Sequence, residues 1–327
     1  MRSVVTGAAG FIGSTLVDRL LAEGQQVIAI DNLTTGAVAN LENAIRYNET
    51  NPGRFTFLRV DVQAPELTDI VAGANPDVIF HLAAQVNPCA SVSDPQFDAR
   101  SNVLGTINLC EASLRAGVRR IVYAASGESR YGTLACMPVD ESTHVNPLSP
   151  YAVAKLAGEM YLRAYAGMYD LAPICLALAK VYGPRQSPHG GGLVADLGSA
   201  MITGRPCTTY RDGIEAHDYV YVDDVVDAFV RAGRASMETT GTYNVGTGRH
   251  TTVTELHEQI AAVLDGASPR SFAADPSGEL HAIALNPTKA EKELGWTPVV
   301  DLAEGIRRTI HWLGATLEPE PSALIGA

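Results

Sequence analysis

The chain has 327 residues, of which 46% are hydrophobic and 18% charged, the balance of a folded globular protein with room for two lobes. Its 24 basic and 36 acidic residues give a formal net charge of −12, which argues against non-specific binding to nucleic acid. No apolar run reaches the ~18 residues of a membrane span, no apolar signal segment precedes the first predicted strand, and the five cysteines are scattered without a C-x-x-C pair. We therefore expect a cytoplasmic protein that binds neither nucleic acid nor membrane.

Strands and helices alternate along the first half of the chain. The pattern predicts strands at Ser3–Thr6, Gln26–Ile30, Phe55–Val60, Val78–Leu82 and Arg120–Ala125. It predicts helices at Phe11–Glu23, closed by Gly24, at Phe97–Ala116 and at Tyr151–Tyr169. Strands interleaved with helices in this way indicate an α/β protein built on a Rossmann-type doubly wound parallel sheet.

The second half is less regular. Residues 183–192 contain two prolines and four glycines, which predicts a loop. Helices are expected at Asp223–Ala235, Thr254–Leu264 and Leu302–Leu313, followed by a frayed tail over 316–327.

A glycine-rich segment, Thr6-Gly7-Ala8-Ala9-Gly10-Phe11-Ile12-Gly13, joins the first strand to the first helix. Gly7 permits a tight turn, Gly10 lets the backbone approach a pyrophosphate, and Gly13 lets the helix lie close to the sheet. Asp31, at the end of the second strand, suits the hydroxyls of an adenosine ribose. Because no Lys or Arg stands in the next three residues, NAD is favoured over NADP. The alternative is a glycine turn that binds nothing, with Asp31 as a surface turn residue.

A second motif lies in Ser149-Pro150-Tyr151-Ala152-Val153-Ala154-Lys155. Ser149 suits a helix N-cap and Pro150 the first helical position, which places Tyr151 and Lys155 on one helix face. An ammonium beside a phenol favours the phenolate, so we expect Lys155 to lower the pKa of Tyr151 and make it a general base near neutral pH. Taken alone, a tyrosine four residues before a lysine is more often structural.

With these two motifs the chain resembles the extended short-chain dehydrogenase/reductases over almost its whole length, residues 2–313. Further matching segments are Asp61-Val62, His81–Gln85, Asn102–Thr106 and Val181–Gln186. Within that family it is most similar to the UDP-glucose 4-epimerases, through Pro147–Tyr151, Pro188–Gly190 and Asp218–Asp224. The resemblance implies an NAD-binding domain of residues 1–176, with 212–246 contributing, and a smaller α/β substrate-binding lobe of residues 177–211 and 247–315.

The resemblance also implies an activity: Tyr151 removes a proton from the 4-hydroxyl of a nucleotide-linked hexose while NAD takes and later returns a hydride at C4. Ser126 is the expected hydroxyl partner, because the family's usual position falls on Gly127; Ser129 is the other candidate. The residues expected to hold NAD are Gly7, Gly10, Phe11, Ile12, Gly13, Asp31, Asn32, Asp61, Val62, Leu82, Ala83, Ala84, Gln85, Asn102, Tyr151, Lys155 and Val181. Those expected to bind the sugar nucleotide are Glu128, Ser129, Arg130, Lys180, Arg185, His189 and His217.

Several substrate-side positions depart from the epimerase pattern. Lys180 replaces an asparagine, His217 replaces an arginine, and the basic residue expected late in the chain falls on His281 or Ala282. Glu128 and Arg130 stand where small or aliphatic residues are commoner. Losing such charge-assisted bonds to phosphate should weaken a UDP-sugar by ~1.5–3 kcal/mol each. Lys180 could replace part of that charge. Alternatively, Lys180 and Arg130 could hold an extra acidic group such as a uronate, or Arg130 could lie on the solvent-exposed rim.

Glu128 keeps a second activity open. The related nucleotide-sugar 4,6-dehydratases carry an Asp-Glu pair in this segment, and here Glu128 and Ser129 stand in those places, so half of the pair is present. The related UDP-glucuronate decarboxylases carry a glutamate where this chain has Ser129, and the lack of that glutamate argues against a decarboxylase. A non-catalytic NAD-binding protein is a third hypothesis, opposed by the intact Tyr151–Lys155 pair.

His189 has no partner at metal-ligand spacing, and the sequence predicts no metal site. Homodimers that pair the helices at 97–116 and 151–169 are expected from the family.

Overall fold

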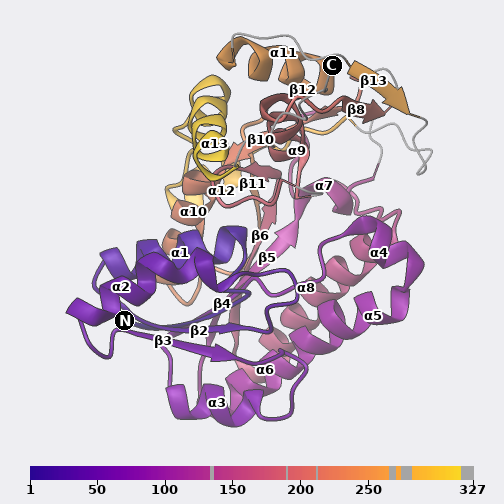
Figure 1. The fold of residues 1–327 in the computed structure, drawn as a ribbon. Coiled ribbons are helices and arrows are strands. Elements are labelled where there is room, and N and C mark those ends of the chain that lie inside the picture. The colour runs from indigo at the N-terminus through magenta and orange to yellow at the C-terminus, as the bar shows by residue number, and fades with distance from the viewer. Residues whose placement is uncertain (133–135, 189–190, 211–212, 265–269, 274–281, 318–327) are drawn as a thin grey trace.

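The computed structural model describes residues 1–132, 136–188, 191–210, 213–264, 270–273 and 282–317 (Figure 1). Its centre is a sheet of seven strands in the order β11-β6-β5-β4-β1-β2-β3, in which every neighbouring pair is parallel. The strands are β1 (Arg2–Thr6), β2 (Gln26–Asp31), β3 (Phe55–Arg59), β4 (Val78–His81), β5 (Arg120–Ser126), β6 (Ala172–Leu178) and β11 (Gly241–Val245). The predicted doubly wound parallel sheet is confirmed, and each of the five predicted strands agrees within one residue at each end.

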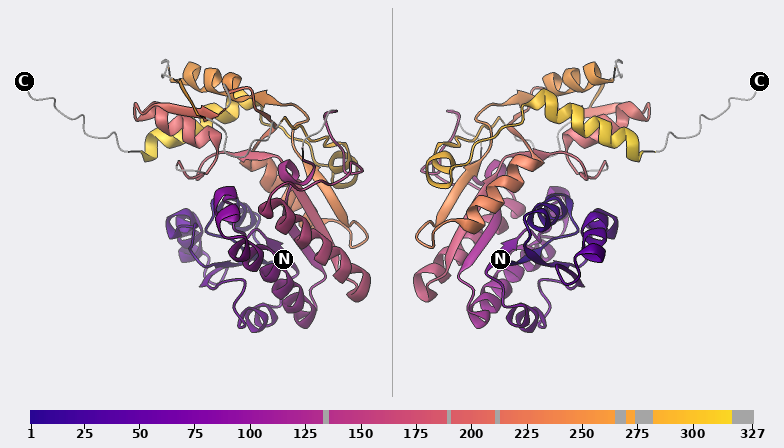
Figure 2. Two further views of the ribbon diagram at one scale, coloured as in Figure 1. Left: turned by 90° about the vertical axis from the view of Figure 1, so that its right-hand side faces the viewer. Right: turned by 90° about the vertical axis from the view of Figure 1, so that its left-hand side faces the viewer.

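Helices cover both faces of this sheet (Figures 1 and 2). One layer contains α1 (Phe11–Ala22) and α10 (Val222–Arg234); the other contains α3 (Leu67–Ala74), α6 (Gly105–Ala116) and α8 (Pro150–Tyr169). Successive strand residues point to opposite layers: Val5 and Phe80 pack into one apolar cluster, whereas Val4 and Ile79 pack into the other. Burial on both faces explains the near-continuous apolar character of these strands.

Shorter elements link the main ones. They are η1 (Val38–Leu41), α2 (Glu42–Thr50), α4 (Pro88–Ser93), α5 (Pro95–Ala99), the π-helical η2 (Arg100–Leu104) and α7 (Gly127–Arg130). The single helix predicted at Phe97–Ala116 is therefore wrong in detail: α5, η2 and α6 follow one another, with a π-helical turn between two α-helices. The predicted domain boundary at 176 falls within β6, whose seven residues are all buried in the large sheet.

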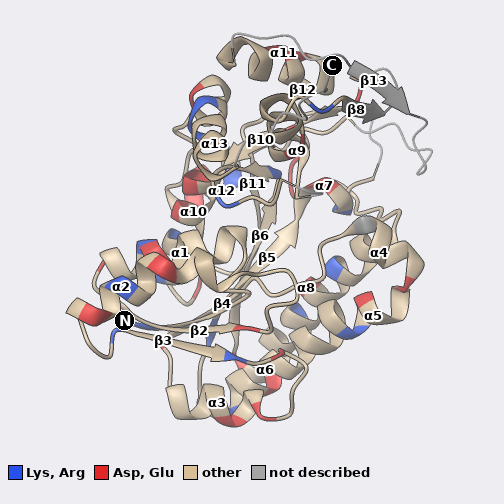
Figure 3. Ribbon diagram, in the orientation of Figure 1, with Lys and Arg blue, Asp and Glu red and all other residues tan. Residues whose placement is uncertain are grey.

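The remaining elements form a smaller part beyond the carboxyl ends of the strands (Figure 2). Three two-stranded sheets occur there: β7 (Lys180–Tyr182) with β10 (Tyr219–Tyr221), β9 (Ala216–His217) with β12 (Thr251–Thr252), and β8 (Cys207–Tyr210) with β13 (Arg270–Ala273). Helices α9 (Leu193–Ile202), α11 (Val253–Val263) and α13 (Leu302–Thr316) pack on one another, and α12 (Thr288–Leu294) packs on β11. Figure 3 shows that most charged residues lie on the helices and few on the central strands.

No helix in the described part of the chain is both long and apolar enough to cross a membrane.

Candidate active site

The predicted site residues gather where β1, β4 and β5 end. These strands are neighbours in the parallel sheet, so the segments that follow them leave from the same edge. The glycine loop follows β1, residues 82–87 follow β4, and α7 follows β5. The strands β1, β2 and β3 extend the sheet in one direction, and the chain then returns to place β4 on the other side of β1. The gap between β1 and β4 is therefore the switch point at which such sheets bind ligands.

The glycine loop is tightly packed. Gly7 has φ +69°, and a Cβ on it would lie 2.6 Å from the amide nitrogen of Ala83. A Cβ on Gly13 would lie 2.0 Å from the carbonyl oxygen of Gly7, so only glycine lets α1 approach the loop this closely. This geometry accounts for two of the three predicted glycines.

The N-terminus of α1 suits an anionic group. Gly10 is the N-cap, and among the described residues no side chain caps this helix and its first turn has no acidic residue. The amides of the first turn, at Phe11 and Ile12, therefore point out of the helix with the positive end of its dipole. A pyrophosphate fits this end, and the glycine loop beside it is the cradle that a larger side chain would fill.

Asp31 ties the loop to β2. One of its carboxylate oxygens accepts the amide of Ala9 at 2.9 Å and the other the amide of Leu33 at 2.8 Å. Each oxygen keeps a lone pair with which it could accept a ribose hydroxyl. Asn32 donates to Asp61 at 2.8 Å, which joins two more of the predicted cofactor residues.

The segment after β4 is held by an amide network. Gln85 donates its backbone N–H to the side-chain oxygen of Asn102 at 2.9 Å, and the Asn102 amide returns a bond to the Gln85 carbonyl at 2.9 Å. Asp98 accepts from both side chains, at 2.9 Å and 3.1 Å. Asn102 lies in the π-helical η2, a type of turn frequent at functional sites. The other residues predicted to hold NAD in this region are the buried Val62 and the partly buried Leu82, Ala83, Ala84 and Val181.

Tyr151 and Ser126 come together from two elements. Ser149 caps α8 by accepting the amide of Ala152 at 3.2 Å, and Pro150 is the first helical residue, as predicted. The Ser126 hydroxyl acts on the Tyr151 phenol as a hydrogen-bonding partner that lowers its pKa, against the larger effect of burial. Ser129 donates its hydroxyl to Ser126 at 2.7 Å.

Gly127 could not carry the hydroxyl that the family usually has at that position. A Cβ on Gly127 would lie 2.4 Å from a methyl carbon of Leu285 and 2.9 Å from the Ala177 carbonyl. The packing of this segment therefore leaves Ser126 as the hydroxyl beside the phenol.

Lys155 is buried under the same site. Its ammonium lies 4.2 Å from the centroid of the Tyr123 ring, a cation–π contact. Burial lowers the pKa of Lys155 to about 8, against the opposing effects of Glu159, Cys175 and Asp98.

The expectation that the pKa of Tyr151 is lowered is wrong for the protein's own groups. Burial raises the pKa of Tyr151 to about 12, and the negative charges of Asp98 and Glu128 add to this, whereas the hydrogen bond from Ser126 opposes it. Burial is the largest effect on this pKa, and the ammonium of Lys155 stacks on the ring of Tyr123. The phenol therefore needs a further positive charge at the site to become a base near neutral pH.

Arg130 is not on an exposed rim, and its charge is not free. The guanidinium is buried and donates to both carboxylate oxygens of Glu159, at 2.7 and 2.6 Å. Glu159 also accepts from Thr242 at 3.0 Å. Sequence reasoning missed Glu159, although it stands one helical turn after Lys155 on the face that carries Tyr151, a spacing that could have identified it.

Three predicted substrate-side residues form one cluster. Lys180 pairs with Glu128 at 3.2 Å, and Nδ1 of His217 lies 2.9 Å from the other oxygen of Glu128. Arg185 instead donates to Asp18 of α1 at 2.6 Å, which ties the loop after β7 to the first helix. His189 lies outside the described residues.

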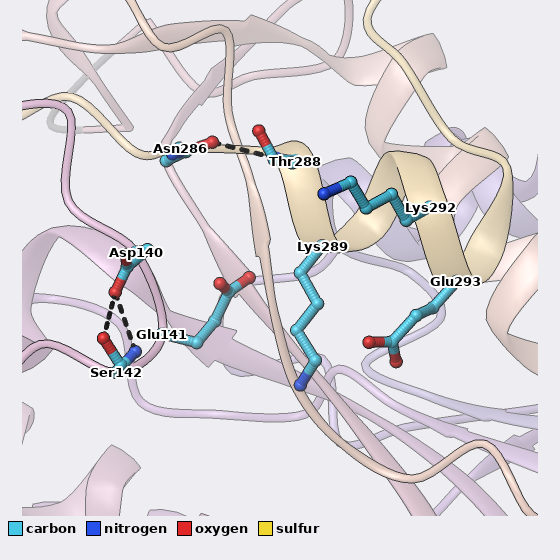
Figure 4. A pocket seen from close by; sticks show the side chains of 8 residues that line it. All are labelled: Asp140, Glu141, Ser142, Asn286, Thr288, Lys289, Lys292 and Glu293. Atoms are coloured by element: carbon cyan, nitrogen blue, oxygen red, sulfur yellow. Dashed lines mark hydrogen bonds between the residues drawn. The ribbon is translucent and has the colours of Figure 1, made fainter.

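A hollow of about 560 Å³ lies apart from these residues, between the segment 140–142 and α12 (Figure 4). Its polar groups are engaged locally: Lys289 donates to the Thr242 carbonyl at 2.8 Å, and Glu293 accepts from Tyr243 at 2.6 Å. It shares no lining residue with the predicted site. Among the residues that the structure describes, no three His, Cys, Asp or Glu side chains are grouped to hold a metal ion.

The chain is similar in sequence and in fold to known NAD-dependent epimerases. The profile of the NAD dependent epimerase/dehydratase family matches residues 3–246. The UDP-glucose 4-epimerase of Mycolicibacterium smegmatis is 48% identical over 313 residues, 95% of this chain and 98% of that protein. The crystal structure of UDP-glucose 4-epimerase with UDP-glucose from Thermotoga maritima has a TM-score of 0.91 at 36% identity, covering 97% of this chain and 100% of that one. The UDP-glucose 4-epimerase of Thermus thermophilus in complex with NAD has a TM-score of 0.89 at 37% identity, with the same coverage.

Proposed function

The chain belongs to the NAD-dependent epimerase/dehydratase family, and we propose that it inverts C4 of a UDP-linked hexose, interconverting UDP-glucose and UDP-galactose. One observation carries the proposal: the phenol of Tyr151 and the hydroxyl of Ser126 lie at the same edge of the sheet as a glycine loop and helix N-terminus that fit a dinucleotide. A phenol so placed can exchange a proton with a sugar hydroxyl.

In this proposal each residue has a separate task. The glycine loop and α1 hold the pyrophosphate of NAD, and Asp31 holds its ribose. NAD, when bound, supplies hydride acceptance and return at C4 of the sugar. Tyr151 takes the proton of the 4-hydroxyl and later returns it, Ser126 hydrogen-bonds the same oxygen, and Lys155 contributes positive charge below the phenol. Tyr151 would become a base near neutral pH once the positively charged nicotinamide ring of NAD lies beside it.

A dehydratase is a weaker candidate. Its chemistry needs an acid that can give a proton to a leaving hydroxyl, and Glu128 was the residue that kept it open. Burial raises the pKa of Glu128, but Lys180 and His217 outweigh that effect and lower it to about 2. The carboxylate therefore has no proton to give near neutral pH.

Proton NMR of the purified protein with NAD and UDP-glucose tests the proposal through the anomeric region. We expect signals of UDP-galactose to appear until equilibrium is reached. An unchanged spectrum with UDP-glucose, at an NAD concentration that saturates the protein, would refute the assignment.

We propose a homodimer formed through α5, η2 and α8. These elements pack side by side and expose apolar side chains along their outer faces. The exposed residues are Phe97, Leu104, Val153, Met160 and Met168. Exposed apolar side chains gathered on one face are typical of a contact with another protein surface. A second copy of the chain offers the same face.

We also propose the predicted two-lobe division and a cytoplasmic location. The division is supported by β11, which returns from the second half of the chain to pair with β6. The location is supported by cysteines 89, 110, 136 and 175, which are unpaired thiols.

A further inference from the structure

Glu128, Lys180 and His217, three positions at which the sequence departs from the epimerase pattern, are in direct contact, and we call them the Glu–Lys–His cluster. They come from α7, β7 and β9, segments separated by up to 89 residues. Glu128 uses one carboxylate oxygen for Lys180, at 3.2 Å, and the other for His217, at 2.9 Å. The three substitutions are therefore one coupled feature.

The cluster lies at the end of β5, where Ser126 also lies. Glu128 follows Ser126 by two residues, and its negative charge is one of those that act on Tyr151. The side chains of Glu128 and Lys180 remain 24% and 27% exposed, whereas that of His217 is only 8% exposed. The carboxylate and ammonium can thus reach a ligand, while His217 supports the carboxylate from behind.

The free hydrogen-bonding positions define what the cluster can bind. Each oxygen of Glu128 keeps a lone pair. The ammonium of Lys180 has three protons, gives one to Glu128 and lies 3.4 Å from Nδ1 of His217, so at least one proton is left for a ligand. An acceptor beside a donor complements a hydroxyl group, which both donates and accepts. A ligand carboxylate only accepts, and it would meet the negative charge of Glu128.

We propose that the Glu–Lys–His cluster is a specificity subsite that binds a hydroxyl group of the sugar and discriminates against a carboxylate in its place. The proposal rests on the proposed function, because it assigns the sugar class that this site accepts. It also answers the alternative in which Lys180 and Arg130 hold a uronate: Glu128 neutralises the first cation and Glu159 the second.

Binding measurements in a Tyr151→Phe background separate recognition from turnover. Isothermal titration calorimetry of the NAD-loaded protein gives dissociation constants for UDP-glucose and UDP-glucuronate. The parent should prefer UDP-glucose. Adding Glu128→Gln frees the Lys180 ammonium and should shift the preference toward UDP-glucuronate by about tenfold or more, the size of one charge-assisted hydrogen bond. Adding Lys180→Gln should shift the preference in the opposite direction.

Glu215→Gln is the matched control. Glu215 lies 3.7 Å from the other ring nitrogen of His217, so its neutralisation disturbs the histidine without changing the face offered by Glu128 and Lys180. The ratio of the two dissociation constants should stay at the parent value. Opposite shifts for the first two variants cannot arise from a loss of stability, which would weaken both ligands together.

The outcomes distinguish the subsite from the function. Binding of UDP-glucose with an unaltered preference in both Glu128→Gln and Lys180→Gln would overturn the subsite alone. Absence of binding of either UDP-sugar to the parent, with no UDP-galactose formed by the unmodified enzyme, would overturn the proposed function and the subsite with it.

Discussion

Replacing Glu159 with Gln should move the alkaline limit of activity to lower pH. Burial holds the pKa of Lys155 at about 8, and Glu159 is the largest of the charges that oppose this effect. Side chains one helical turn apart are about 6 Å from each other, where two unit charges interact by roughly 3 kcal/mol at an effective dielectric constant of about 20. Loss of the carboxylate charge should therefore lower the pKa of Lys155 by about 1–2 units.

The pH dependence of kcat/KM for UDP-glucose measures this effect. The proposed mechanism needs Lys155 in its charged form, so activity is expected to fall as the pH rises through the pKa of Lys155. The fall should begin about 1–2 pH units lower in the Glu159→Gln variant than in the parent. An alkaline limb that stays at the parent position would refute the electrostatic role of Glu159 and leave it a packing residue.

Stability needs a separate control, because the same change leaves Arg130 without its carboxylate. Breaking a buried ion pair by removing one partner costs about 3–5 kcal/mol. The double variant Arg130→Gln and Glu159→Gln removes both charges and should regain most of that loss in thermal denaturation. It should keep the displaced alkaline limb, because the carboxylate beside Lys155 is still absent.

The remaining predictions concern the phenol, its partner, the loop and the dimer face. Tyr151→Phe should reduce turnover by about 100- to 10,000-fold while NAD still co-purifies, measured by NMR and by absorbance of the released cofactor; parent-level turnover would rule out the phenol as the base. Ser126→Ala should lower kcat by about 10- to 100-fold with little change in NAD binding, in steady-state kinetics; an unchanged kcat would exclude the hydroxyl from the reaction. Gly13→Ala should abolish NAD binding, measured by calorimetry, because the new methyl meets a loop carbonyl at 2.0 Å. Val153→Glu with Met160→Glu should give a monomer in light scattering, and an unaltered mass would exclude this face as the interface.

Much of the large sheet is predictable because most of its strands are buried on both faces, β3 at the sheet edge being the exception among the five predicted strands. Apolar runs of four to seven residues separated by helices identify β1 to β5 within one residue at each end. The glycine spacing is only partly local: a Cβ on Gly13 would meet the backbone of Gly7, six residues earlier, whereas a Cβ on Gly7 would meet Ala83 in the segment after β4.

The short strands and the charge pairs are not predictable in this way. β7 has three residues and β9 has two, too few for any periodicity to signal a strand. The alternative that places Arg130 on an exposed rim is wrong, because the fold buries Arg130 against Glu159, which lies 29 residues further along the chain. A sequence motif records which residue is present, whereas the availability of its charge depends on what the fold places against it.

The pKa of Tyr151 shows how far that dependence reaches into the chemistry. Spacing alone puts an ammonium four residues from a phenol and suggests that the pair suffices for base catalysis. In the folded chain the ammonium stacks on Tyr123, and two carboxylates, Asp98 and Glu128, act against ionisation of the phenol. In the proposed mechanism, a site arranged in this way keeps Tyr151 protonated until the positively charged nicotinamide ring of NAD is present. Proton transfer is then coupled to cofactor occupancy, so a sugar bound without NAD would not lose its proton.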